Sequence, residues 1–218
     1  MKKIFDYYFP DWDIHFEQIM EKDPNHEYQS KQRARAISHV NERTVAIDVG
    51  GHVGLWANKL ADDFQHVHSF EPVPEIRECF EQNVKKDNVT LYPFAMWDSI
   101  GVQKLLLPTK NSGAGYVEHE EMNETTKLIR NNGQVYKEID INCRTLDSFN
   151  IQDVSFIKYD VQGCEYKALM GSVETITTFK PVLCCEITTD FRVKLLIEKL
   201  GYVFIDKIGK EHIFKWKT

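Results

Sequence analysis

The chain has 218 residues, of which 42% are hydrophobic and 28% charged, and its formal net charge is −6. This balance is typical of a globular domain with a sizeable core, and the length suits one α/β domain with additions better than two full domains. The negative charge and the lack of a long basic run argue against duplex nucleic acid, no apolar run approaches a membrane span, and residues 1–6 lack the apolar stretch of a signal peptide.

Residues 1–43 predict an N-terminal helical extension that caps the domain and covers a ligand. Apolar side chains recur there at helical spacing, first at Trp12, Phe16 and Ile19 or Met20, then at Ala34, Ile37 and Val40. Aromatic stripes of this kind are more often packing than cofactor contacts.

From residue 44 to 218, strand and helix patterns alternate. Strands are expected at 44–49, 66–71, 88–94, 154–160 and 181–187, and helices at 54–64, 74–87, 164–178 and 190–200. Residues 202–206 and 211–216 predict a closing hairpin around Gly209 and Lys210. The alternation predicts a Rossmann-like α/β domain with a mostly parallel seven-stranded sheet, right-handed crossovers and an antiparallel C-terminal edge hairpin.

Residues from about 100 to 145 interrupt this alternation. Val102–Leu107 and Val135–Cys143 predict two strands of an inserted β-hairpin, and the polar loop between them contains Asn111 to Gly115 and Asn131-Asn132-Gly133. A long polar loop inside a compact domain is usually functional or disordered. We therefore expect the insertion to lie on the substrate side and to set specificity, with His119 as a candidate base.

The segment Asp48-Val49-Gly50-Gly51-His52-Val53-Gly54 follows the first strand of the alternation and opens a helix. The next strand ends at Glu71. Two adjacent parallel strands that each present a carboxylate at the carboxyl end are typical of a nucleoside site. The glycines allow a ligand to approach the backbone, and the second acid accepts hydrogen bonds from ribose hydroxyls.

Three other interpretations of these residues stay open. An ordinary strand–turn–helix junction explains the glycines alone, but not the second strand-terminal acid. A nicotinamide-dependent dehydrogenase has a similar sheet, yet the glycine spacing differs from G-x-G-x-x-G. A non-catalytic binding module keeps the fold without turnover.

Later strand ends supply the candidates for chemistry. Asp98 follows the third strand and is a candidate for the adenine side. Asp160 closes the fourth strand, where a carboxylate orients a substrate nucleophile, accepts its proton or balances a cationic cofactor. Lys158 is either catalytic or a structural ion-pair partner, and Glu186, at the end of the fifth strand, is a second candidate for the substrate side.

The sequence predicts neither a metal site nor a catalytic thiol. His66 and His68 alternate on one strand face without further ligands at metal spacing. The five cysteines are odd in number and include no Cys-x-x-Cys, and two of them, Cys184 and Cys185, lie in an apolar run. Buried free thiols in a reducing compartment are expected, which favours a cytoplasmic location.

Several blocks together resemble the FkbM-type methyltransferases, class I enzymes that use S-adenosylmethionine. The blocks are Ala46 to Gly54, Phe70-Glu71-Pro72, Thr145-Leu146-Asp147, Phe156 to Glu165, and Pro181 to Glu186. They occur in order over residues 44–187. The resemblance implies methyl transfer, commonly to oxygen, with a sugar, a glycan or another small hydroxylated metabolite as the acceptor.

The resemblance also implies roles for individual residues. The methionine part of the cofactor would be surrounded by Asp48, Gly50, Gly51, His52 and Gly54. Glu71 would bind the ribose with Pro72 shaping the adjoining turn, Ala95 and Met96 would lie near adenine, and Asp160 would stand between cofactor and acceptor. Two positions depart from the family pattern: His52 stands where Asn is common, and Gln162 where an acid is usual.

Overall fold

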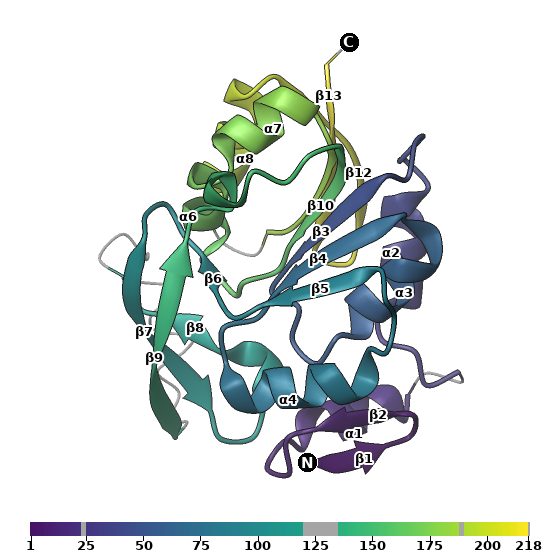
Figure 1. Ribbon diagram of the computed structural model, residues 1–218, viewed down its shortest axis with the longest axis vertical. Helices are drawn as coiled ribbons and strands as arrows, with labels where there is room; N and C mark the ends of the chain where they lie inside the picture. The colour runs from purple at the N-terminus through teal and green to yellow at the C-terminus, as the bar shows by residue number, and fades with distance from the viewer. Residues whose placement is uncertain (23–24, 120–134, 188–189, 218) are drawn as a thin grey trace.

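The computed structural model describes residues 1–22, 25–119, 135–187 and 190–217, and a seven-stranded sheet forms its centre (Figure 1). The strand order is β12-β13-β11-β10-β3-β4-β5. In chain order the strands are β3 (Val45–Val49), β4 (His66–Phe70), β5 (Val89–Tyr92), β10 (Val154–Tyr159), β11 (Val182–Glu186), β12 (Tyr202–Ile208) and β13 (Glu211–Trp216). The predicted Rossmann-like architecture is confirmed.

The C-terminal hairpin differs in one respect from the predicted antiparallel edge. Strand β13 is antiparallel to both of its neighbours, β11 and β12, and lies between them. The edge strand β12 therefore runs in the same direction as the five parallel strands. The reason is that β12 follows a helical crossover, and the return strand then fills the space beside β11.

Helices cover both faces of the sheet. The residues of each strand alternate between the two faces, so that Ala46 and Phe156 pack with α2 (Ser30–Ile37) and α3 (Leu55–Asp63). The opposite face packs against α6 (Glu165–Met170), α7 (Val173–Phe179) and α8 (Phe191–Lys199).

The helix expected over 164–178 is two helices. Helix α6 is capped by Gly171, where a Cβ would lie 1.9 Å from the carbonyl oxygen of Trp97. A side chain at this position is therefore excluded by the backbone that follows the third strand of the alternation. The close approach fixes α6 and α7 beside the start of the insertion.

The insertion forms a second, four-stranded sheet in the order β6-β9-β7-β8. Its strands are β6 (Ala95–Met96), β7 (Gly101–Pro108), β8 (Tyr116–Val117) and β9 (Tyr136–Arg144). The predicted hairpin is confirmed as the antiparallel pair β7–β9, to which β6 and β8 add. A short 3-10 turn, η1 (Ser112–Ala114), precedes β8, and η2 (Leu146–Phe149) follows β9. The expected Asn131-Asn132-Gly133 part of the loop lies outside the described residues.

The N-terminal extension contains two helices, α1 (His15–Met20) and α2, but it begins with a hairpin that the helical prediction missed. Strands β1 (Lys2–Ile4) and β2 (Tyr7–Phe9) pair and lie against α4 (Pro74–Asn83), as Figure 1 shows. The Tyr8 amide donates to Asn83 Oδ1 (2.6 Å), and Asn83 Nδ2 donates to the Tyr8 carbonyl (2.9 Å). Tertiary contacts of this kind stabilise strands too short to show a period in sequence.

The cysteines and the helices agree with the sequence. All five cysteines are free and buried. Among the described helices, none has both the length and the apolar composition that crossing a bilayer requires.

Candidate active site

A cavity opens at the carboxyl ends of β3, β4 and β10. Its lining includes nine of the residues singled out from the sequence: Gly50, Gly51, His52, Glu71, Pro72, Ala95, Met96, Lys158 and Asp160. Most of these residues lie in the segments that follow β3, β4 and β10, whereas Lys158 lies within β10 and Ala95 and Met96 form β6 of the inserted sheet. Their convergence is the arrangement expected for ligand sites in such sheets.

The glycine turn, residues 50–54, lies against the ends of the neighbouring strands. Gly50 has a φ of +85°, and a Cβ there would lie 2.0 Å from the carbonyl oxygen of Asp160. A Cβ on Gly51 would lie 2.1 Å from Ser69 Oγ. Both glycine amides donate to the carbonyl of Phe70, at 3.1 and 2.9 Å. No larger residue fits here, so the backbone itself forms this side of the cavity.

Glu71 holds the glycine turn from the next strand. Its Oε2 accepts from the His52 amide (3.0 Å) and its Oε1 from the Val73 amide (2.9 Å). The side chain is buried but lines the cavity, and burial raises the pKa of Glu71 to about 7. The carboxylate is thus pre-oriented by two backbone groups, and each of its oxygens can accept a further hydrogen bond.

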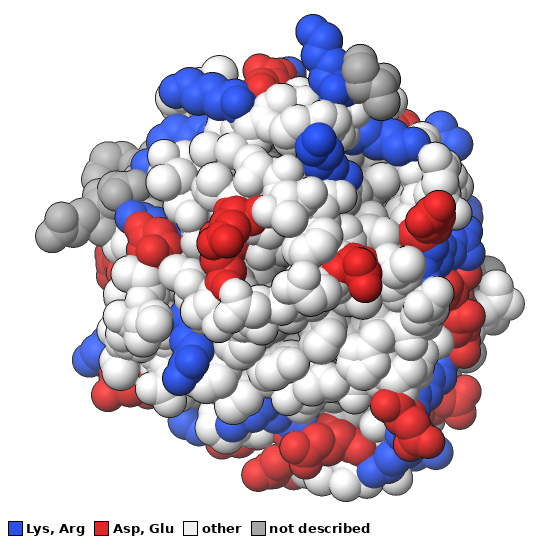
Figure 2. Space-filling view, turned by 45° about the horizontal axis from the view of Figure 1, so that its top comes forward, with Lys and Arg blue, Asp and Glu red and all other residues white. Residues whose placement is uncertain are grey.

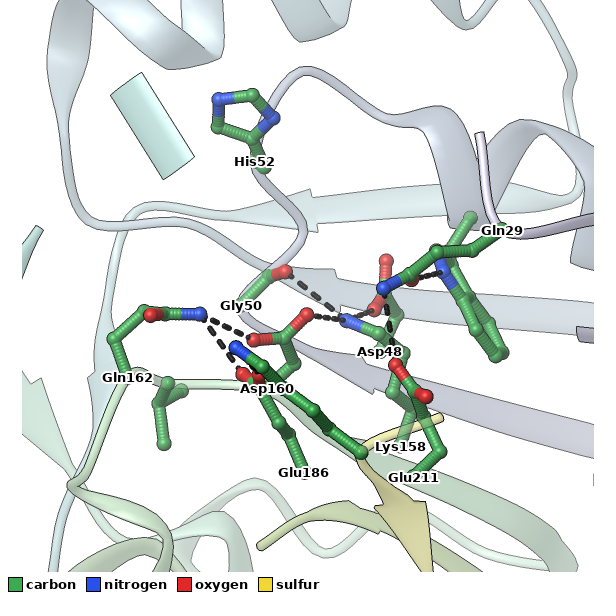
Figure 3. Close-up of polar contacts among 12 residues, drawn as sticks. Gln29, Asp48, Gly50, His52, Lys158, Asp160, Gln162, Glu186 and Glu211 are labelled. Atoms are coloured by element: carbon green, nitrogen blue, oxygen red, sulfur yellow. Dashed lines mark hydrogen bonds and ion pairs between the residues drawn. The ribbon is translucent and has the colours of Figure 1, made fainter. Parts of the chain in front are cut away.

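Lys158 lies between two carboxylates (Figure 3). Its Nζ is 3.2 Å from Asp48 Oδ1, 3.5 Å from Asp160 Oδ2 and 3.4 Å from the Gly50 carbonyl oxygen. Burial acts to lower the pKa of Lys158, but the two carboxylates outweigh it and the pKa is raised. Lys158 therefore stays cationic and cannot serve as a base, and the ion-pair interpretation describes it.

Asp48, expected to adjoin the methionine part of the cofactor, is not among the residues that line the cavity. Its side chain is fully buried and accepts from Ser69 Oγ at 3.2 Å as well as from Lys158. The strand register explains this, because Asp48 lies directly between Lys158 of β10 and Ser69 of β4. Burial raises the pKa of Asp48, and Lys158 opposes that rise. Asp48 thus acts on the cavity through Lys158.

Gln162 joins Asp160 to Glu186. Its Nε2 donates to Asp160 Oδ1 and to Glu186 Oε2, both at 2.9 Å, and Lys210 Nζ lies 3.0 Å from Glu186 Oε1. Burial and the neighbouring Asp160 raise the pKa of Glu186 to about 8. Burial also acts to raise the pKa of Asp160, but Lys158 and the hydrogen bonds outweigh it and the pKa is lowered. At neutral pH the pair holds its proton on Glu186, and Asp160 remains a carboxylate.

Besides Asp48, three of the predicted cofactor-binding and catalytic residues lie outside the cavity lining. Gly54 begins α3, and a Cβ there would lie 2.5 Å from Val84 Cγ2. Asp98, the candidate for the adenine side, pairs with Lys167 at 2.8 Å and is not among the lining residues. Glu186 adjoins the lining through Gln162 and Asp160. Gln162 was expected as a departure from the family pattern but not as a site residue.

Six aromatic side chains also line the cavity, most of which the sequence did not single out for ligand contact. They are Phe16, Tyr28, Trp56, Phe70, Trp97 and Tyr116. Trp56 Nε1 donates to Gln29 Oε1 (2.7 Å), and Gln29 Nε2 donates to Glu211 (3.0 Å), beside the Lys158 cluster in Figure 3. Phe16 and Tyr28 come from the N-terminal extension, which was expected to cover a ligand, although spacing alone did not separate them from core residues.

The histidines on β4 have structural partners. His66 Nε2 lies 2.8 Å from Thr90 Oγ1, and His68 Nδ1 lies 3.0 Å from Tyr92 OH. Across the described ranges no group of side chains is arranged to hold a metal ion. His119 packs edge-on against Trp97 with ring centroids 5.7 Å apart.

Sequence and structure comparisons identify the family and the fold. A family model described as the methyltransferase FkbM domain matches residues 48–204. The chain belongs to the FkbM methyltransferase family. The match contains the glycine turn, Glu71, the inserted sheet and the Asp160–Glu186 pair. Among curated proteins, no sequence matches the chain at a significant level.

The fold is shared with one solved FkbM methyltransferase, and two other solved methyltransferases are similar at lower scores. The FkbM methyltransferase of Methylobacillus flagellatus KT is 16% identical, with a TM-score of 0.53 over 80% of this chain and 44% of that one. This chain thus spans less than half the length of that protein. A precorrin-6y C5,15-methyltransferase from Geobacter metallireducens is 13% identical (TM-score 0.47; 86% and 87% covered). A putative tRNA (m1A22) methyltransferase from Streptococcus pneumoniae, solved in complex with S-adenosyl-L-methionine, is 12% identical (TM-score 0.48; 85% and 71% covered).

Proposed function

We propose that this protein is an S-adenosylmethionine-dependent O-methyltransferase that acts on a hydroxyl of a sugar, a glycan or another small metabolite. The observation that carries the proposal is the meeting of Gly50, Gly51, Glu71 and Asp160 in one cavity at the carboxyl ends of parallel strands. A backbone that tolerates no Cβ and a carboxylate held by two amides suit a nucleoside ligand.

The lining residues divide by chemistry along the cavity. In this proposal Gly50 and Gly51 adjoin the methionine part, Glu71 accepts from the ribose hydroxyls, and Ala95 and Met96 flank the adenine. Apolar side chains of the inserted sheet, Leu105, Leu107 and Ile141, pack in one cluster with Val73 and Ile76 just beyond Glu71. This wall excludes water from the adenine side.

Asp160 is the proposed base. The cofactor supplies a methyl group already activated by the sulfonium, so the protein mainly aligns an acceptor oxygen in line with it, which is worth about 7–11 kcal/mol in well-oriented intramolecular reactions. Lys158 keeps Asp160 ionised, and Gln162 fixes its Oδ1. The carboxylate then accepts the hydroxyl proton as the acceptor oxygen gains its methyl group.

The surface favours a small acceptor over duplex nucleic acid. On the face shown in Figure 2, basic side chains are interspersed with acidic ones, and no continuous basic stripe crosses it. The net charge of −6 points the same way. Binding to duplex nucleic acid draws chiefly on contacts between basic side chains and phosphates.

Transfer of a labelled methyl group from S-adenosylmethionine to a panel of sugars, glycans, hydroxylated metabolites and RNA tests the proposal. We expect a hydroxylated small molecule to be labelled and Asp160→Asn to lower kcat by about 100-fold or more, because a general base contributes 10²–10⁴. Asp190→Asn, which changes an aspartate outside the cavity lining, is the matched control. Labelling of RNA alone would contradict the proposal, as would full activity of Asp160→Asn.

A further inference from the structure

A chain of hydrogen bonds connects the N-terminal extension to the glycine turn. It begins at Asp13, which is fully buried. Asp13 Oδ1 accepts from the amides of His15 (2.9 Å) and Phe16 (3.0 Å), and its Oδ2 accepts from the amide of Ser112 (2.6 Å). The Ser112 hydroxyl also donates to Oδ2. Four donors therefore fix this carboxylate between α1 and the turn η1 of the inserted sheet.

Ser112 also forms a hydrogen bond with His52. The serine is 3% exposed, and because its proton is donated to Asp13, its oxygen accepts from His52 Nε2 at 2.7 Å. The His52 ring also stacks on Phe16, with centroids 4.7 Å apart. Burial lowers the pKa of His52 to about 4, so the ring is neutral at neutral pH and carries its proton on Nε2.

The backbone of His52 joins the hydrogen-bond chain of Asp13 and Ser112 to the cavity. The residue has a φ of +49°, a left-handed conformation that is unfavourable for any residue other than glycine and persists only where surrounding contacts hold it. Its amide donates to Glu71 Oε2 at 3.0 Å. In Figure 3 the ring points away from the Lys158–Asp160 cluster. The ring is thus an anchor, and the backbone amide is the part that meets the site.

The order of the three groups excludes a nucleophilic triad. In a triad the histidine stands between the acid and the serine and takes the serine proton. Here Ser112 stands in the middle and its proton goes to Asp13. The arrangement can hold a conformation, but it does not activate the hydroxyl.

We propose that Asp13 and Ser112 are positioning residues of the cofactor site, which they serve by fixing His52 and, through its amide, Glu71. The inference rests on the proposed function. The N-terminal extension, which includes Asp13, then contributes to the site. Asp13 lies outside residues 48–204, which match the family model. The extension and the inserted sheet then close the cavity as one unit with the glycine turn.

Calorimetric titration with S-adenosylhomocysteine tests this proposal. We expect Ser112→Ala to weaken binding about tenfold, the effect of one lost buried hydrogen bond, and Ser112→Thr, which keeps the hydroxyl, to stay within about threefold of the wild type. Asp13→Asn keeps an oxygen for the His15 and Phe16 amides but removes the acceptor for Ser112, and should match Ser112→Ala. Ser148→Ala removes an exposed serine hydrogen bond elsewhere and should change nothing.

Nitrogen NMR of the ligand-free protein adds a readout that a general loss of stability does not move. In the wild type, His52 should show a proton held on Nε2, and in Ser112→Ala that proton should exchange freely with water. Equal affinity of wild type and Ser112→Ala, or an unchanged His52 signal, overturns the positioning role alone. If the wild type does not bind S-adenosylhomocysteine, the proposed function fails and this inference fails with it.

Discussion

Glu71→Gln is expected to weaken S-adenosylhomocysteine binding about 100-fold. The substitution keeps the shape of the side chain but replaces a carboxylate that lies in the cavity, held by the amides of His52 and Val73. Two charge-assisted hydrogen bonds to ribose hydroxyls would lose strength, at about 1.5 kcal/mol each, and about 3 kcal/mol corresponds to a hundredfold change. Isothermal titration of both proteins measures the difference.

The pH dependence of the same titration separates the charge of Glu71 from its shape. Burial raises the pKa of Glu71 to about 7, so the carboxylate forms as pH rises through 7. Only the ionised form accepts from both hydroxyls, and the ionised fraction falls roughly tenfold between pH 8 and pH 6. Wild-type affinity should fall by about that factor, and the affinity of Glu71→Gln should change much less.

Glu75→Gln is the matched control for both experiments. Glu75 lies on α4 and pairs with Lys137 and Trp12 outside the cavity lining, so its replacement should leave affinity within about twofold. If Glu71→Gln binds S-adenosylhomocysteine as tightly as the wild type does, or if the affinity of both proteins has the same pH dependence, Glu71 does not contact the ligand.

Lys158→Met is expected to give the largest loss of stability of any single substitution considered. The lysine compensates Asp48, which is fully buried, and Asp160. Removing one partner of a buried pair leaves a charge without compensation and costs about 3–5 kcal/mol. Chemical denaturation should show this loss, and Asp48→Asn combined with Lys158→Met should recover part of it.

Lys104→Met tests whether burial causes the large loss of stability expected for Lys158→Met. Lys104 pairs with Glu138 at 2.9 Å, but both side chains are exposed, so its loss should cost less than about 1 kcal/mol. A loss below about 1 kcal/mol for Lys158→Met would mean that Asp48 is protonated in the folded protein and that Lys158 does not keep Asp160 ionised.

The parallel sheet could be predicted because its signals are local. Buried strands appear as short apolar runs, and α3, α4 and α8 each follow the strand that the alternation assigns to them. The N-terminal hairpin and the place of β13 could not be predicted in the same way. Both depend on partners distant in sequence, Asn83 for the hairpin and β11 for the return strand.

The same distinction between local signals and distant partners applies to the candidate site. Backbone-driven features such as Gly50 and the position of Glu71 at a strand end were predictable, because close approach and strand direction leave marks in the sequence. Whether an acid faces the cavity or a neighbouring strand depends on the strand register. The register of β3 and β10 places Asp48 directly beside Lys158. The bonds of Gln162 and Ser112 join segments whose proximity only the folded chain defines.

A crystal structure with bound S-adenosylhomocysteine tests the central claim most directly. The account predicts ribose hydroxyls on the Glu71 carboxylate, the homocysteine part along Gly50 and Gly51, and the sulfur facing Asp160 across a space large enough for an acceptor hydroxyl. A nucleoside bound away from Glu71, or a sulfur separated from Asp160 by packed side chains, would contradict it.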